Sequence, residues 1–305
     1  MQLSWIDNNQ FAGEYMADHE KYFADAGIPK TTLVPGGSSA TTAEAAITSG
    51  TALLGVGDLF TTANADAAGG DLKIIAATYQ RNPFALISMT KDPIATPADL
   101  VGKTIAIPDV DDSLWKTFLA ANNVDASKVK VVPYQFDSSI LTSGQVDGIL
   151  TYTTVGANLL KSEGHDAQEF LLADNGLPLV GDAIVTSAKA LKEDRPTLTA
   201  ALYAIIRGWY WSAAHPEDAN HLTNSIYAAA QKYDDAPQLI AMKANVELLE
   251  SPDTASNGLL TISDSLQQAN VKVLNDSGIK VTAKDIFDTS LITEIYAAHP
   301  ELPKK

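Results

Sequence analysis

The sequence predicts an α/β fold of two lobes, and three observations support this prediction. Short apolar runs alternate with helix-like segments through the first two thirds of the chain, which favours mainly parallel strands with helices between them. The chain has 305 residues, more than one hydrophobic core usually accommodates. No long Gly/Ser linker divides the sequence, so we expect the lobes to be joined by crossing strands rather than by a flexible tether.

Strands are predicted where short apolar runs are bounded by turn residues. They are Leu3–Ile6, Thr32–Pro35, Leu53–Val56, Leu72–Thr78, Phe84–Met89, Thr104–Ile107, Val129–Val132, Gly148–Tyr152 and Ala183–Thr186. A helix start is marked at Thr96, where a proline follows and Asp99 can complete a capping box. After about Leu191 the pattern is almost wholly helical, with a break at His215, which precedes a proline.

The crossing strands are expected at Phe84–Met89 and Ala183–Thr186. Residues 1–88 and 186–305 then form a discontinuous first lobe, and residues 89–185 form a second lobe inserted into it. Closure of the two lobes should occur by bending at these strands.

The composition excludes several classes of function. The formal charge is −16, with 21 Lys and Arg against 37 Asp and Glu, and no basic cluster is present, which argues against nucleic acid and anionic lipid as partners. There is no cysteine, so disulfides, thiol nucleophiles and thiolate metal sites are excluded. The five histidines form no His-x-x-x-His pair, and we expect neither a metal nor a cofactor. No apolar run is long enough to span a bilayer.

Motifs along the chain resemble one known family. In order, they read "SWIDNNQFAGEYMADHEKYFADAGI" with a following "PGG", "QRNPFALISM", "TPADLVGKTIAI", "VVPYQFD", "GQVDGILTY" and "GWYWSAAHPEDA". Together they resemble the ABC-transporter solute-binding proteins for thiamine-pyrimidine precursors and riboflavin, a family that also includes eukaryotic thiamine-pyrimidine synthases. The resemblance implies a type II periplasmic-binding-protein fold, in which two α/β lobes close over a small molecule and deliver it to a membrane permease.

The resemblance also implies which residues form the ligand pocket. Carried over position by position, they are Trp5, Asn8, Gly36, Gly37, Asp58, Gln80 and Tyr152. The sequence departs from the family after Tyr152, where many pyrimidine-binding relatives read Tyr-Asn-Glu and this chain reads Tyr152-Thr153-Thr154. A carboxylate that could pair with an aminopyrimidine is therefore absent from that position.

The opening motif places an aromatic residue and two amides where the first strand meets the first helix. Trp5 is either a core residue or a flat face for a ligand, and Asn8 is the better pocket amide, since Asn9 can cap the following helix. The glycines Gly36 and Gly37 with Ser38 either cap a helix or let a ligand approach the backbone.

Two acidic residues, Asp112 and Asp182, are further candidates for the ligand site. Asp112 belongs to an acidic cluster that begins a helix, where carboxylates complement the helix dipole and would repel nitrate, sulfonate or phosphate. Trp115, one turn later, is either a second aromatic wall or a core residue. Asp182, just before the second crossing strand, is a further pocket candidate.

These observations predict a solute-binding protein of an ABC importer that binds a small, flat, nitrogen-containing heterocycle, and not an enzyme. One alternative is a binder of oxyanions, which the acidic cleft disfavours. A second is a pyrimidine synthase, whose cysteine-rich motif is missing. We expect a monomer located outside the cytoplasm, either periplasmic or anchored as a lipoprotein, whose leader is absent from this sequence.

Overall fold

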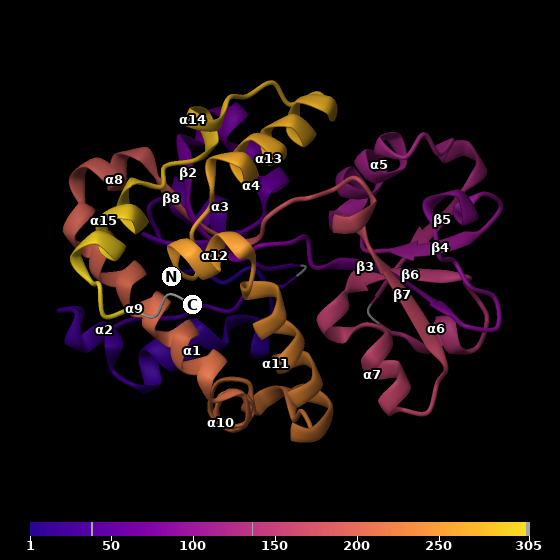
Figure 1. Ribbon diagram of the computed structural model, residues 1–305, viewed down its shortest axis with the longest axis horizontal. Coiled ribbons are helices and arrows are strands. Elements are labelled where there is room, and N and C mark those ends of the chain that lie inside the picture. The colour runs from indigo at the N-terminus through magenta and orange to yellow at the C-terminus, as the bar shows by residue number, and fades with distance from the viewer. Residues whose placement is uncertain (38, 136, 303–305) are drawn as a thin grey trace. The chain divides into compact units, whose positions relative to one another are not determined.

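The computed structural model describes residues 1–37, 39–135 and 137–302, and its chain forms two compact units (Figure 1). The first unit comprises Met1–Gln80 and the chain from Val180 onward, and the second comprises Arg81–Leu179. The chain passes between the units at residues 80–81 and 179–180, rather than at the expected positions 88–89 and 185–186. The physical reason is strand pairing, because each of the two expected crossing strands is hydrogen-bonded within the sheet of one unit.

The first unit contains a three-stranded sheet in the order β1 (Gly55–Gly57), β8 (Gly181–Ser187) and β2 (Leu72–Tyr79). Strand β8 is antiparallel to both neighbours, so β1 and β2 run in the same direction. Isolated parallel bridges extend this sheet, joining Gln2 to Val34 and to Gly55. The strands predicted at residues 3–6 and 32–35 are thus wrong, because the bridges on the first segment's side are made by Gln2, which precedes it, and the second segment has a bridge only at Val34.

Helices surround this sheet and account for most of the first unit. They are η1 (Asn9–Phe11), α1 (Ala12–His19), α2 (Tyr22–Asp25), α3 (Ala43–Thr48), α4 (Leu59–Ala65), η2 (Asp66–Gly70), α8 (Ala188–Glu193), α9 (Arg195–Ala214), α10 (Pro216–Leu222), η8 (Thr223–Tyr227), η9 (Ala229–Gln231), α11 (Asp235–Leu249), α12 (Pro252–Asn257), α13 (Asp264–Asp276), α14 (Ala283–Ile286) and α15 (Ser290–Ala298). The predicted break at His215 is confirmed, since α9 ends before it and α10 begins after it.

Helices α1 and α9 pack closely because glycines line their contact. A Cβ atom on Gly208 would lie 1.9 Å from the carbonyl oxygen of Gly13, so a larger residue would force the two helices apart. The neighbouring Trp209 is fully buried in the same core. This core supports the start of α1 and hence the opening motif.

The second unit contains a five-stranded sheet in the order β5 (Lys130–Pro133), β4 (Thr104–Ile107), β6 (Gly148–Tyr152), β3 (Phe84–Met89) and β7 (Ala167–Leu171). Strand β3 is antiparallel to its neighbours β6 and β7, and the other pairs of this sheet are parallel. Strand β7 was not among the predicted strands. Its short, partly polar sequence Ala-Gln-Glu-Phe-Leu carries a weak local signal, and pairing with β3 defines it.

Helical segments connect the strands of the second unit. They are η3 (Pro97–Leu100), η4 (Asp109–Asp111), α5 (Asp112–Ala121), η5 (Ala126–Lys128), α6 (Ser139–Thr142), η6 (Thr153–Val155), α7 (Ala157–Ser162) and η7 (Leu172–Asn175). Helix α5 covers one face of the sheet, and α6 and α7 cover the other (Figure 1). The predicted capping box of Thr96 and Asp99 is confirmed, although it begins a single 3-10 turn.

Candidate functional site

One edge of the sheet in the first unit gathers several of the predicted site residues. Strands β1 and β2 end at this edge while the antiparallel β8 begins there, as the pairs Gly57–Ala183 and Tyr79–Gly181 show. Asp58 and Gln80 directly follow β1 and β2, and Asp182 is the second residue of β8. This edge is where open α/β sheets bind ligands.

The opening motif reaches the same edge and is held against the "PGG" turn. The amide of Gly36 donates to the carbonyl of Trp5 at 2.8 Å. A Cβ atom on Gly36 would lie 2.5 Å from the carbonyl oxygen of Leu3, so only glycine permits this close approach. Gly37 has a φ of 136°, a conformation that also favours glycine. Trp5 itself is half-buried and packs against the core of the first unit.

Of the two asparagines of the opening motif, it is Asn8 and not Asn9 that caps the following helix. Asn8 is the N-cap of η1, because its Oδ1 accepts from the amide of Gln10 at 2.7 Å and its Nδ2 donates to the carbonyl of Ile6 at 3.0 Å. Asn9 is buried, and its Nδ2 donates to Oδ1 of Asn220 at 2.8 Å. The expectation that Asn9 caps the helix is therefore wrong, since its side chain is directed into the core instead.

Gln10 is a residue that the sequence analysis did not single out, and it contacts the edge directly. Its Nε2 donates to Oδ1 of Asp182 at 2.9 Å and to Oγ of Ser4 at 3.4 Å. Asp182 is buried, with an unusual φ of 46°. Burial raises the pKa of Asp182 to about 8, against the opposing effect of the hydrogen bond from Gln10. A carboxyl that keeps its proton near neutral pH can both donate and accept.

The other predicted residues of this edge differ in exposure. Asp58 is exposed and is the N-cap of α4, where its Oδ1 accepts from the amide of Thr61 at 2.8 Å. Gln80 is buried, and its Nε2 donates to the carbonyl of Ala77 at 3.1 Å. Its Oε1 is buried with no hydrogen-bond partner among the described residues. Ser38 lies outside the described residues.

In the second unit, Tyr152 lies at the corresponding edge, where β6 ends. It pairs with Phe84, the first residue of β3, and the two rings meet edge to face with centroids 4.7 Å apart. Tyr152 is half-buried. Thr154, at the position of the missing carboxylate, is buried.

Helix α5 begins after β4 at this same edge. Asp112, its first residue, forms an exposed ion pair with Lys116 at 2.5 Å. Trp115 is 1% exposed and packs against Phe118 with ring centroids 5.6 Å apart. This placement supports the core alternative for Trp115 rather than the aromatic wall.

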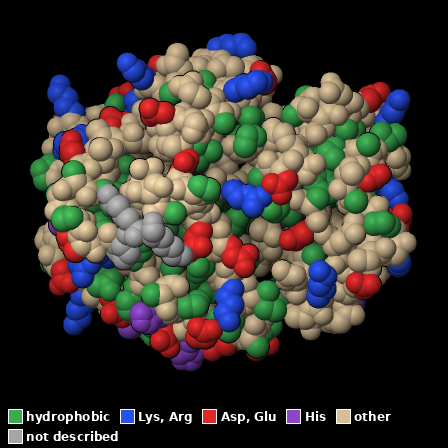
Figure 2. All heavy atoms as spheres, in the orientation of Figure 1, with side chains coloured by type: hydrophobic (Ala, Val, Ile, Leu, Met, Phe, Trp, Pro, Cys, Tyr) green, Lys and Arg blue, Asp and Glu red, His purple; other side chains and the backbone are tan. Residues whose placement is uncertain are grey.

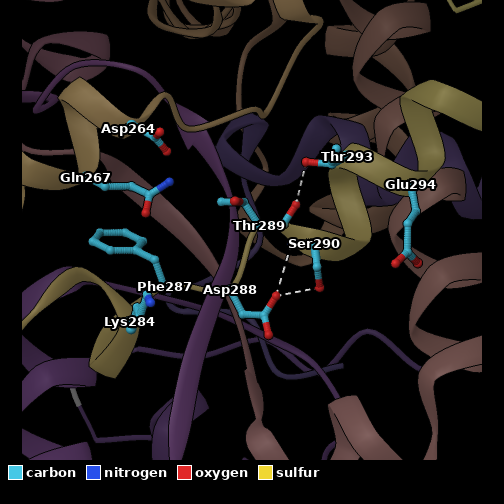
Figure 3. Close-up of a pocket in the computed structure, with 9 residues that line it drawn as sticks. All are labelled: Asp264, Gln267, Lys284, Phe287, Asp288, Thr289, Ser290, Thr293 and Glu294. Atoms are coloured by element: carbon cyan, nitrogen blue, oxygen red, sulfur yellow. Dashed lines mark hydrogen bonds between the residues drawn. The ribbon is translucent and has the colours of Figure 1, made fainter.

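An open hollow of about 560 Å³ lies on the first unit, between α13, α14 and α15 (Figure 3). Gln267 and Phe287 lie on one side of it, and on the other Oδ1 of Asp288 accepts from Oγ of Ser290 at 2.5 Å. None of the predicted site residues lines this hollow. It is therefore separate from the candidate site.

Within residues 1–37, 39–135 and 137–302, no group of three or more His, Cys, Asp or Glu could hold a metal ion. In the same part of the chain, no helix has the length and apolar character needed to cross a membrane. Lys and Arg side chains are scattered among Asp and Glu on the face that Figure 2 shows, so this face presents no concentrated basic surface.

Two α/β units, one inserted into the other, form the fold of periplasmic binding proteins, and several solved structures share this fold. The alkanesulfonate-binding protein SsuA from Xanthomonas axonopodis pv. citri is similar with a TM-score of 0.65 at 15% identity, covering 93% of this chain and 94% of that one. The nitrate-binding protein NrtA from Synechocystis PCC 6803 has a TM-score of 0.69 at 11% identity, covering 100% and 91%. The desulfurization enzyme DSZB has a TM-score of 0.60 at 12% identity, covering 98% and 99%.

The chain belongs to the NMT1/THI5-like family, whose model matches residues 8–219. One relative is the formylaminopyrimidine-binding protein of Halalkalibacterium halodurans, 28% identical over 72% of this chain and 67% of that protein. Another is the riboflavin-binding protein RibY of Chloroflexus aurantiacus, 24% identical over 94% of this chain and 82% of that protein. The family predicted from the sequence motifs is thereby confirmed.

Proposed function

We propose that this protein is the extracytoplasmic solute-binding component of an ABC importer and that it binds a small, flat, nitrogen-containing heterocycle. Two relatives are named for binding a formylaminopyrimidine and riboflavin, and both ligand names denote nitrogen heterocycles. We further propose that the protein acts as a monomer, held outside the cytoplasm as a periplasmic protein or a lipoprotein, and delivers its ligand to a membrane permease.

The observation that best supports this ligand class is the contact of Asp182, at the edge of the first sheet, with Gln10 of the opening motif, which also carries Trp5. A ring can stack on an indole, which contributes roughly 0.5–1.5 kcal/mol beyond the buried area. Amide and carboxyl groups that both donate and accept match ring nitrogens and amino groups. Tyr152, at the edge of the second sheet, supplies a further aromatic face.

An oxyanion ligand is the main alternative, because SsuA and NrtA share the fold and are named for sulfonate and nitrate. The residues proposed here include no Lys or Arg, so an oxyanion would find no cation among them, and the exposed carboxylate of Asp58 would repel it. Arg81 follows Gln80 directly, but its guanidinium forms an ion pair with Asp174 at 2.5 Å. We therefore favour the heterocycle.

A thermal-shift screen distinguishes the two ligand classes. Aminopyrimidines, thiamine, riboflavin and purines form one panel, and taurine, nitrate and alkanesulfonates form the other. We expect at least one heterocycle to raise the melting temperature and no oxyanion to do so. Stabilisation by an alkanesulfonate alone would overturn the proposal.

Variants of two tryptophans then locate the site. Trp5→Ala should weaken binding of the heterocycle about tenfold, through loss of stacking and burial. Trp211→Ala is the matched control, because Trp211 lies on α9 and stacks on His215 with ring centroids 4.9 Å apart. Isothermal titration calorimetry measures both, and a Trp5→Ala protein that binds like the parent would remove Trp5 from the site.

A further inference from the structure

The carboxylate of Glu169 accepts hydrogen bonds from two neighbouring segments of the second unit. Glu169 lies on β7, opposite Ile87 of β3, and its side chain is half-buried. Its Oε1 accepts from the hydroxyl of Thr153 at 2.6 Å, and its Oε2 accepts from the amide of Ala157 at 3.0 Å. Thr153 begins η6 and Ala157 begins α7, so the carboxylate connects the turn to the helix that follows it.

The local backbone is built around this carboxylate. Gly156 is the N-cap of α7 and has no side chain with which to cap the helix. A Cβ atom there would lie 2.4 Å from Oε2 of Glu169, so the carboxylate occupies the space of a capping side chain. Glu169 thereby satisfies one of the free amides at the start of the helix.

The turn that Glu169 holds follows Tyr152 directly. The amide of Thr153 donates to the carbonyl of Pro83 at 2.8 Å, and the amide of Gly156 donates to the carbonyl of Thr153 at 3.1 Å. Pro83 precedes Phe84, whose ring contacts Tyr152. Tyr152 therefore directly precedes a turn that Glu169 contacts at both ends, at Thr153 and at Ala157.

We propose that Glu169 is a positioning residue for ligand binding: by bridging Thr153 and Ala157 it holds the turn that orients the ring of Tyr152. This inference rests on the proposed function, in which Tyr152 contacts the heterocycle. Without the bridge, binding has to order the turn, and the entropy of that ordering weakens the complex.

Hydrogen exchange in the absence of ligand tests the bridge itself. Glu169→Ala should raise exchange of the Ala157 amide, and Thr153→Val, which replaces the hydroxyl by a methyl group of similar size, should raise exchange in residues 153–156. Gln168→Ala, a change at the adjacent half-buried position of β7, is the control and should leave both unchanged. Unchanged exchange in Glu169→Ala would overturn the inference, whatever the ligand proves to be.

Calorimetry with the heterocycle found in the screen tests the link to binding. Glu169→Ala should weaken binding about fivefold, the effect expected for a lost helix cap, and Glu169→Gln, which keeps one acceptor, should restore part of it. In a Tyr152→Ala background, Glu169→Ala should cause no further loss, because the two residues act as one unit. Additive losses would show that Glu169 does not act through Tyr152. Unaltered binding by Tyr152→Ala alone would instead refute the proposed role of Tyr152.

Discussion

Glu14, on helix α1, is a carboxylic acid buried in the core of the first unit, and its titration should govern stability near neutral pH. Its side chain is 1% exposed. Burial raises its pKa from the ordinary value of 4.5 to about 7. The charge of Glu14 in turn raises the pKa of Asp182, so the two acids are coupled.

The size and sign of the effect follow from this shift. A pKa raised from 4.5 to about 7 corresponds to roughly 3 kcal/mol in the free energy of unfolding. Because the pKa of the folded state is the higher one, the stabilisation is complete below pH 4.5 and is lost as the pH rises through about 7. Glu44 and Asp182, with pKa values raised by burial to about 7 and about 8, add to the same trend. The parent protein should be more stable at pH 5 than at pH 8.

Glu14→Gln isolates the contribution of Glu14, because the amide has nearly the shape of the protonated acid and cannot become charged. Urea denaturation at several values between pH 5 and pH 8 gives the free energy of unfolding. We expect the variant to match the parent near pH 5 and to exceed it by up to about 3 kcal/mol at pH 8. Glu193→Gln, at an exposed site on α8, should leave the pH profile unchanged. Parallel profiles for the parent and Glu14→Gln would refute the reasoning.

Three further predictions concern the site and its motion. Gly36→Ala should lower the melting temperature and weaken binding, because the added Cβ would lie 2.5 Å from the carbonyl oxygen of Leu3; a variant that melts and binds like the parent would contradict this. Saturating heterocycle should reduce the radius of gyration in small-angle scattering through bending at residues 80–81 and 179–180, and an unchanged radius would count against closure. Mass spectrometry should recover the heterocycle unaltered after prolonged incubation, whereas a new product would favour the enzyme alternative.

The sequence by itself determined the elements with strong local signals. Strands β3, β4 and β6 have the bounds predicted for them, because their apolar runs end at clear turn residues. The capping box at Thr96 and the break at His215 were also predictable, since a cap and a proline act within one turn of a helix. The family, too, could be identified from the order of short motifs along the chain.

Only the tertiary structure decided the features that depend on distant partners. Strand β7 exists because β3 pairs with it. The direction of the Asn9 side chain into the core depends on Asn220, which is 211 positions away. The contact between Gln10 and Asp182 likewise joins residues 172 positions apart. Pairing and burial between such residues depend on how whole elements pack, and no local pattern of residue types contains that information.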